Sequence, residues 1–324
     1  MRSGSMRGGK IAILVPTYNG GSLLGETVMS AAKAGLTPDS YEILVSDNAS
    51  TDGSTAALPG HDPLGAPIVI RRNGVNLGRV ANWNCALSLA EELGFSFALF
   101  LMVGDIVTDR AVLDLRERMM DHDAVLGIAS LRIADESLRP LRLARRICWH
   151  GDPCAGLPAK RFLAQSLAQG AMLYAPLGAN LYRIDGEPRL RFDPGDETHT
   201  DHLATALFAQ ESGKPIVYLD RPISLWRRRD GRFHSSMTVA QRLAGDLRVM
   251  ECACKACNVA PDYPRIRASL LLRGTLFCRG NLLRAWRITR AMAGRHPMSW
   301  AWLARLIARQ LRNGTPWLVE TMTQ

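Results

Sequence analysis

The stretch ILVSDNASTDGS, residues 43–54, changes from apolar to polar within a few positions. Its first three residues are the aliphatic and β-branched types found in buried strands. The polar part contains two carboxylates, Asp47 and Asp52, with one amide and two hydroxyl side chains between them. Turns use such side chains, and so do ligand sites. The place of this stretch in the fold therefore decides what it does.

Strands and helices are predicted to alternate around this stretch. KIAILVPTY (10–18) has the pattern of a strand buried on both faces, and LLGETVMSAAKAG (23–35) has helical apolar spacing. Further strands are expected in YEILVS, PIVIRR and FALFLMV, and further helices in RVANWNCALSLAEELG and RAVLDLRERMM. This order is typical of an open α/β sheet with right-handed crossovers.

Ligands of such sheets bind at the carboxyl ends of the strands. The polar residues that follow these ends are Thr17, Tyr18, Asp47, Asn48 and Asp105. A dinucleotide-binding fold would show the glycine pattern GxGxxG after the first strand, but VPTYNG stands there. The residues alone thus predict a ligand site at this edge, without a dinucleotide cofactor.

Four segments between residues 10 and 110 carry a family resemblance: VPTYNG, VSDNASTDGS, NGVNLGRVANWN and LMVGDIV. In this order and spacing they resemble family 2 glycosyltransferases of the GT-A fold, which are inverting enzymes with nucleotide-sugar donors. The resemblance implies an α/β fold with a GT-A (Rossmann-like) open mixed sheet flanked by helices. A looser likeness to the acceptor-side region of the family begins at DETHTDHLA (196–204).

The predicted domain organisation follows the reach of that resemblance. Residues 1–9 are expected to be a flexible terminus or tag. Residues 10–236 form the glycosyltransferase domain, with a nucleotide-sugar-binding half (10–108) and an acceptor half (109–236). Residues 237–324, which the resemblance does not reach, are expected to be a basic C-terminal helical region.

The resemblance assigns the nucleotide base to the opening stretch. Uracil, thymine and guanine each present an N–H beside a carbonyl, and Asp47 matches the family's base-reading aspartate. Backbone groups of Pro16 and Thr17, with the ring of Tyr18, would complete the base pocket. The alternative for the whole polar cluster is turn chemistry, which is the role expected of Asn48, Ser50 and Asp52 in either case.

The segment LMVGDIV (101–107) departs from the family pattern, in which two or three aspartates usually stand here. Only the last is matched, by Asp105, and the resemblance puts it at the metal bound to the donor diphosphate. A lone carboxylate can hold Mg²⁺ or Mn²⁺, because these ions keep waters and bind phosphate oxygens. A divalent metal is therefore expected, with His234 as the second candidate ligand.

Arginines are further candidates for binding the diphosphate. Trp83 stands where relatives often carry an arginine, so Arg79, one helical turn earlier, is the candidate replacement and Trp83 could be a core residue. Arg229 stands where the family often has a histidine; arginine cannot ligate a metal but can clamp phosphate. Asn76, in NGVNLGRVANWN, completes the predicted nucleotide-binding set.

Inverting transfer is a single displacement that needs a base on the acceptor side. The resemblance gives this role to Asp201, at the start of a predicted helix. Glu197 and Asp196 are rival carboxylates in the same loop. Helix capping by Thr200 or Asp201 is the non-catalytic alternative.

The end of the chain is strongly basic, and the 324 residues carry a net charge of +10. No acidic residue occurs from Tyr263 to Asn313, where arginines and apolar segments interleave. Such a mixture suits helices that lie on an anionic membrane surface or bind a lipid phosphate. The alternative is a packing or homodimer surface. Nucleic acid is not expected, because the interleaved aromatic and glycine motifs of known readers are missing.

Composition limits the remaining classes. The chain is 47% hydrophobic and 22% charged, as globular proteins are, and no apolar run reaches the length of a membrane-spanning helix. Among the cysteines only Cys254 and Cys257 have CxxC spacing, so free thiols are expected rather than a zinc site. The predicted location is the cytoplasm, peripheral to the inner face of the membrane.

The resemblance to family 2 glycosyltransferases implies the transfer of a sugar from a UDP-, dTDP- or GDP-sugar to an acceptor hydroxyl with inversion. The acceptor is expected to be a saccharide, a lipid-linked sugar or a small molecule. The reduced aspartate motif leaves one alternative, a non-catalytic protein that binds nucleotide sugars.

Overall fold

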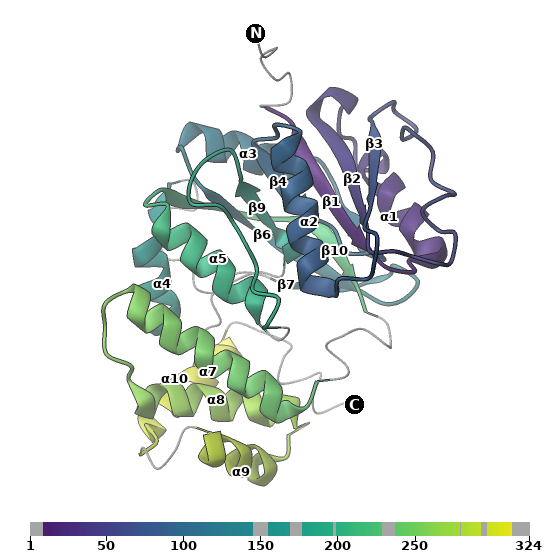
Figure 1. The fold of residues 1–324 in the computed structure, drawn as a ribbon. Coiled ribbons are helices and arrows are strands. Elements are labelled where there is room, and N and C mark those ends of the chain that lie inside the picture. Colours follow the sequence, from purple (N-terminus) through teal and green to yellow (C-terminus); the bar gives the residue numbers. More distant parts are fainter. Residues whose placement is uncertain are drawn as a thin grey trace. The chain divides into compact units, whose positions relative to one another are not determined.

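The computed structural model describes residues 9–144, 155–168, 177–196, 199–228, 237–278, 280–292 and 297–312. The chain divides into two compact units. The first, Met1–Ala159 with Tyr174–Arg229, contains the sheet; the second, Lys160–Leu173 with Asp230–Gln324, is helical (Figure 1). The predicted domain boundary at residue 236 lies outside the described residues and stays a prediction.

The first unit is built on one mixed sheet with the strand order β3-β2-β1-β4-β9-β6-β10-β5 (Figure 1). The strands on this path are β1 (Ile11–Thr17), β2 (Tyr41–Asp47), β3 (Ile68–Arg72), β4 (Phe97–Phe100), β5 (Ile106–Val107), β6 (Leu126–Ala134), β9 (Asn180–Arg183) and β10 (Pro215–Arg227). Two short strands lie off the path, β7 (Pro140–Ala144) on β6 and β8 (Leu157–Pro158) on β10.

The direction of the strands gives the sheet its mixed character. Strands β1 to β4 are parallel, as the sequence predicts. Strand β9 then runs antiparallel between β4 and β6, and β10 runs parallel to β6. This is the predicted mixed α/β sheet, and its four N-terminal strands all end at one edge.

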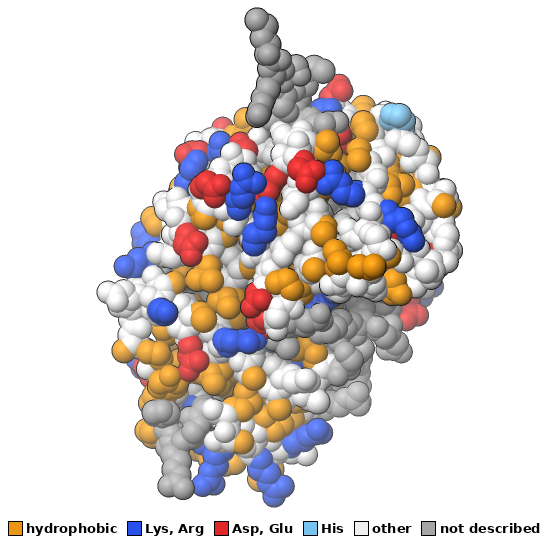
Figure 2. All heavy atoms as spheres, in the orientation of Figure 1, with side chains coloured by type: hydrophobic (Ala, Val, Ile, Leu, Met, Phe, Trp, Pro, Cys, Tyr) orange, Lys and Arg blue, Asp and Glu red, His pale blue; other side chains and the backbone are white. Residues whose placement is uncertain are grey.

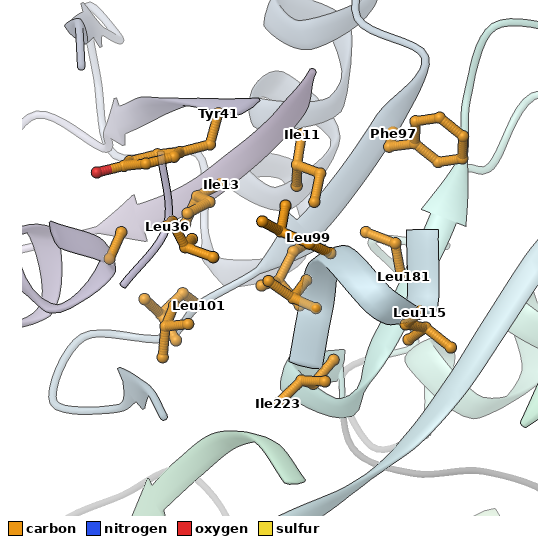
Figure 3. Close-up of a cluster of buried hydrophobic side chains, with 14 of the residues drawn as sticks. Ile11, Ile13, Leu36, Tyr41, Phe97, Leu99, Leu101, Leu115, Leu181 and Ile223 are labelled. Atoms are coloured by element: carbon orange, nitrogen blue, oxygen red, sulfur yellow. The ribbon is translucent and has the colours of Figure 1, made fainter. Parts of the chain in front are cut away.

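Helices cover both faces of the sheet. They are α1 (Gly21–Lys33), α2 (Arg79–Glu92), α3 (Ala111–Asp121) and α5 (Thr200–Glu211). Side chains of α1 and α3 share one buried cluster with Ile11, Ile13 and Leu99, which project from the same face of their strands (Figure 3). Because side chains alternate along a strand, the intervening residues face α2 and α5.

An aromatic cluster fills this second face. Trp83 of α2 contacts the rings of Phe100 and Phe192, with centroids 6.4 and 5.4 Å apart, and Tyr182 of β9 contacts Phe208 of α5 at 6.3 Å. Trp83 is only 4% exposed. It is therefore a core residue, which is the alternative that the sequence left open.

The second unit contains α4 (Ala159–Ala168), α7 (Val239–Ala256), α8 (Tyr263–Phe277), α9 (Leu282–Met292) and α10 (Trp300–Arg312). Helix α7 begins with a capping box, in which Thr238 and Gln241 each bond the other's backbone N–H. Its core joins Leu243 and Met250 of α7 to Ile266 and Leu270 of α8. None of the helices in the described residues is long and apolar enough to cross a membrane.

Candidate functional site

The carboxyl ends of β1, β2 and β3 stand side by side. Thr17 is in register with Asp47, and Asp47 is in register with Arg72. The backbone N–H of Asn48 donates to the Thr17 carbonyl at 2.9 Å, so a hydrogen bond also joins β1 to the residue that follows β2. Pro16, which pairs with Ser46, precedes this row. The structure thus brings the predicted base pocket together.

The Asp47 carboxylate is fully buried, and both of its oxygens accept hydrogen bonds. Oδ1 accepts the backbone N–H of Ser50 at 2.9 Å. Oδ2 accepts the Thr55 hydroxyl at 3.1 Å and the Arg72 guanidinium at 2.5 Å. Burial by itself raises the pKa of Asp47, but the hydrogen bonds from Ser50, Arg72 and Thr55 outweigh it and lower the pKa. Asp47 is therefore ionised at neutral pH.

Arg72 belongs to this site, although the sequence analysis did not single it out. Its side chain is 52% exposed, so the guanidinium pairs with Asp47 and still faces solvent. The segment PIVIRR ends with Arg72, and the last residue of a strand that runs parallel beside β2 lies next to Asp47. Only the order of the strands was missing.

The lowered pKa of Asp47 gives a first prediction. Because the folded pKa lies below the unfolded value, Asp47 contributes stability above that value, about 3.9, which is lost as pH falls through the folded pKa. Asp47→Asn should lower the free energy of unfolding at neutral pH by about 1–3 kcal/mol, since a charged partner of buried donors is removed. Urea denaturation at neutral pH and below pH ~4 measures the free energy of unfolding of both proteins. The difference between the wild type and Asp47→Asn should become smaller in acid.

Glu136→Gln, at an exposed position, is the control for that measurement. A gap for Asp47→Asn that stays constant through acid, or that Glu136→Gln reproduces, would contradict the role of the ionised carboxylate.

The other polar side chains of residues 47–54 hold loops together. Asn48, Ser50 and Asp52 each accept a backbone N–H at 2.9 Å, and the donors are Leu77, Asn19 and Gly21 respectively. These bonds are side chain to backbone, as predicted, but they tie the turn to neighbouring loops. Ala49, at the centre of the turn, has a φ of 63°. The cluster therefore combines turn chemistry with a buried carboxylate.

Asn76 and Arg79 lie in the loop and first turn that follow β3. Asn76 Oδ1 accepts the Asn48 side-chain amide at 2.7 Å and the Gly78 N–H at 2.9 Å. Arg79 begins α2, and its guanidinium lies 4.5 Å from the centre of the Trp83 ring. Asn76 thus shapes the loop, and Arg79 rests on the core tryptophan.

The end of β1 offers two groups for a ligand. The Tyr18 side chain is 51% exposed, and the Thr17 hydroxyl is buried without a hydrogen-bond partner among the described residues. A Cβ on Gly20 would stand 2.7 Å from that hydroxyl, so only glycine lets the chain pass so close to it. An unpaired buried hydroxyl is costly and favours a partner from a ligand or water.

Asp105 lies at the same edge, beyond the end of β4, and is 8% exposed. Its Oδ1 accepts the backbone N–H of Arg227, the last residue of β10, at 3.1 Å. Arg227 is itself buried and pairs with Glu26 of α1 at 2.7 Å. The Gly104 N–H donates to the Thr27 hydroxyl at 2.8 Å, which fixes the preceding residue. Asp105 is thus fixed by β10 through Arg227, and the residue before it is fixed by α1 through Thr27.

A divalent metal at Asp105 would need phosphate oxygens and waters as its further ligands. Within the described part of the chain there is no group of three or more His, Cys, Asp or Glu side chains that could hold an ion. Mg²⁺ and Mn²⁺ accept one or two protein carboxylates when phosphates and waters complete the shell. Asp105 can supply one such oxygen. The other predicted contacts, Arg229 and His234, lie outside the described residues.

Asp201 lies in the first turn of α5 and is half-buried. The N-cap of this helix is His199, without a side-chain capping bond, and the Thr200 hydroxyl accepts the N–H of Asp193 at 2.8 Å. The capping alternative is therefore wrong for both predicted residues. Of the rival bases, Asp196 is 6% exposed, and Glu197 lies outside the described residues.

A buried polar cluster links α5 to the sheet. Tyr182 of β9 shares hydrogen bonds with Thr205 of α5 at 2.9 Å and Asn180 at 3.1 Å. Burial raises the pKa of the Tyr182 hydroxyl, and the nearby charge of Asp201 adds to the rise. Because β9 is antiparallel to β4, its first residue, Asn180, lies at the carboxyl edge of β4. Helix α5 is thus anchored through Thr205 to β9, the strand that begins at this edge.

Comparison with known proteins gives one family and one short sequence match. The family described as "Glycosyl transferase family 2" matches residues 12–182. Over 81 residues the chain is 38% identical to the abequosyltransferase RfbV of Salmonella typhimurium. That match covers 25% of this chain and 24% of the relative.

Two solved structures share the fold. TarS of S. aureus in complex with UDP-GlcNAc has a TM-score of 0.60 and 18% identity, covering 95% of this chain and 90% of that chain. The mannosyltransferase PcManGT from Pyrobaculum calidifontis, in complex with GDP-Man and Mn²⁺, has a TM-score of 0.54 and 16% identity, covering 96% and 83%. The first unit therefore has the GT-A fold.

Proposed function

Because the chain belongs to glycosyl transferase family 2, we propose that it transfers a sugar from a nucleotide-diphosphate-sugar donor to an acceptor hydroxyl with inversion. The observation that carries the proposal is the row of Thr17, Asp47 and Arg72 at one sheet edge, inside the matched segment, with Asp105 beyond it. TarS and PcManGT were solved with UDP-GlcNAc and GDP-Man, which supports a UDP-, dTDP- or GDP-sugar as donor.

Asp47 and Arg72 read the base in this proposal. Because the Asp47 carboxylate is fully buried, an imide N–H can reach it only when the half-exposed Arg72 side chain shifts away from Oδ2, and that oxygen then accepts the N–H. The half-exposed Arg72 guanidinium can donate to the carbonyl beside that N–H. The exposed ring of Tyr18 and the unpaired Thr17 hydroxyl supply a stacking face and a further hydrogen bond.

Asp105 serves the diphosphate. A divalent ion, held by Asp105 and by phosphate oxygens, would neutralise the charge that develops on the leaving nucleoside diphosphate. Arg79 and Arg229 are the candidate clamps for the same charge, since guanidinium groups bind phosphate in a bidentate manner. The bond between Asp105 and the Arg227 backbone supports this role, because it fixes the position of the carboxylate at the sheet edge.

Asp201 acts as the general base on the acceptor. Its carboxylate takes the proton of the acceptor hydroxyl while that oxygen forms a bond to the anomeric carbon. The bond from the anomeric carbon to the diphosphate breaks on the opposite side, so the configuration inverts. The half-buried start of α5 supports this role, and Glu197 is the rival base. The acceptor is a saccharide, a lipid-linked sugar or a small molecule.

A non-catalytic nucleotide-sugar-binding protein is the second candidate. The single carboxylate of LMVGDIV favours it, because a reduced aspartate motif weakens metal binding. Assays for hydrolysis and transfer with a panel of donors separate the two candidates. Nucleotide binding without any turnover would support the second candidate.

A thermal-shift screen tests the donor site directly. UDP, dTDP and GDP, with and without Mn²⁺, should raise the melting temperature on the order of 5 °C at concentrations well above Kd. ADP is the control, because adenine has no N–H beside a carbonyl. A screen in which no imide nucleotide exceeds ADP would contradict the proposed base pocket.

A further inference from the structure

Helices α9 and α10 of the second unit expose large apolar side chains. These are Leu282 (57% exposed), Leu283 (61%), Trp300 (63%) and Ile307 (37%). Trp286 of α9 stacks on Trp300 of α10, with ring centroids 5.9 Å apart and an interplanar angle of 13°. The stacked rings join the two helices, and the exposed apolar side chains on both sides of this contact are called the apolar patch.

On α10 the apolar patch is separate from the stripe that faces the core. On α10, Trp300, Ala304 and Ile307 follow the spacing i, i+4, i+7 of one exposed stripe, while Leu303 and Leu306 are buried. On α9, Ala285 and Thr289 are buried, Leu282 continues their stripe into solvent at the start of the helix, and Leu283 lies beside that stripe. A globular helix needs one apolar stripe for its core, and a second, exposed one marks an interaction site.

Exposed arginines surround the apolar patch. They are Arg284, Arg287 and Arg290 on α9 and Arg305 on α10. Over the lower part of the face drawn in Figure 2, where α9 lies, hydrophobic and basic side chains are mixed without acidic ones. The sequence agrees, since no Asp or Glu occurs from Tyr263 to Asn313. The charge of any partner is therefore expected to be negative.

Three kinds of partner can be compared with this surface. A second copy of the chain would bring the same arginines and a net charge of +10, so its patch would be repelled. Nucleic acid would match the charge, but Leu282, Leu283 and Ile307 cannot stack on bases as aromatic rings do. An anionic lipid surface satisfies both features, because phosphates pair with arginines while leucine and tryptophan enter the interface.

We propose that α9 and α10 dock the protein on an anionic lipid surface. Leu282, Leu283 and Trp300 insert at the level of the headgroups, and the arginines of α9 pair with lipid phosphates. Docking of this kind keeps the helices in the plane of the interface and requires no spanning segment. It is independent of the donor site, so its test does not rely on activity.

Co-sedimentation of the full chain with lipid vesicles tests this docking. Binding should be strong to vesicles that contain phosphatidylglycerol, weak to phosphatidylcholine alone, and lower at ~1 M salt than at ~0.1 M. Each basic residue near an anionic surface contributes about fivefold, so Arg287→Gln with Arg290→Gln should weaken binding about 25-fold. Leu282→Ser with Leu283→Ser should weaken binding at least about 10-fold, because buried apolar area is lost.

The first unit supplies matched controls for both double variants. Arg110→Gln with Arg139→Gln removes the same charge, and Leu64→Ser with Leu141→Ser removes two exposed leucines, all at exposed positions. Both should bind vesicles as the wild type does, and melting curves should show that every variant is folded. Equal and salt-insensitive binding to both lipids would overturn the proposal, as would equal losses in the controls. Absence of vesicle binding would also overturn the proposal. Self-association or RNA binding that Leu282→Ser with Leu283→Ser abolishes would then identify the partner of the patch.

Discussion

Replacing Asp201 by asparagine should lower turnover by a factor of about 10²–10⁴, with donor affinity nearly unchanged. An acceptor hydroxyl is a poor nucleophile at neutral pH, and a positioned carboxylate removes its proton as the new bond forms. Asparagine has almost the same size and polarity but cannot take up that proton. Single-turnover rates with a donor identified by thermal shift measure the effect, and the donor Kd is measured separately.

The position of Asp201 makes this test more decisive than the sequence suggested. The N-cap of α5 is His199, so Asp201→Asn loses only the favourable interaction of a charge with the helix N-terminus. That loss lowers the free energy of unfolding by about 0.3–1 kcal/mol and leaves the turnover rate unchanged. Glu211→Gln, at the other end of the same helix, is the matched control. Normal turnover by Asp201→Asn would exclude it as the base, and Glu197→Gln would be the next variant.

Asp105→Ala should lower turnover by at least about 10³-fold and remove the effect of Mn²⁺ on nucleotide binding. Asp105 is the described carboxylate at this edge that the family resemblance assigns to the metal at the donor diphosphate. Its loss would leave the charge of the leaving group without its partner. Activity with and without chelator, and nucleotide titrations with and without Mn²⁺, provide the two measurements.

Asp105→Asn separates charge from structure in this experiment. The asparagine oxygen can still accept the N–H of Arg227, so the strand end stays in place while the negative charge is gone. Asp121→Ala, at the exposed end of α3, is the control for loss of a carboxylate. If the wild type ignores a chelator and Asp105→Asn is active, the diphosphate is held by an arginine clamp instead. Arg229 and Arg79 would then be the first to test.

The sequence predicted the local elements well because their patterns are local. β1 is an almost continuous apolar run, β2 has the apolar segment 43–45 at its centre, and α1 and α2 have apolar residues at helical spacing and end near glycines. Strand β9 was harder, because four residues, Asn180–Arg183, are too short for a periodic signal. Its antiparallel place between β4 and β6 depends on pairing partners far away in the chain.

The site was predictable to the same extent. Asp47 and Asp105 follow strands whose ends the sequence marks, so topology alone puts them at one edge. Arg72 needed the order of the strands, and the buried pair of Arg227 with Glu26 needed the packing of β10 on α1. A buried arginine cannot be told from an exposed one by its neighbours in WRRRDGRFH. Tertiary structure decides between them.

The late insertion of β9 also bears on how this chain acquires its structure. During synthesis the parallel strands β1 to β4 emerge first, and the free side of β4 finds its neighbour only when Arg183 has left the ribosome. Until then β4 is an edge strand with unpaired backbone groups, which is the kind of surface that leads to aggregation. Strand β5 pairs with β10, so it stays unpaired until that still later strand has been synthesised. The nascent first unit is therefore vulnerable over most of its length, and chaperones would be expected to act in that interval.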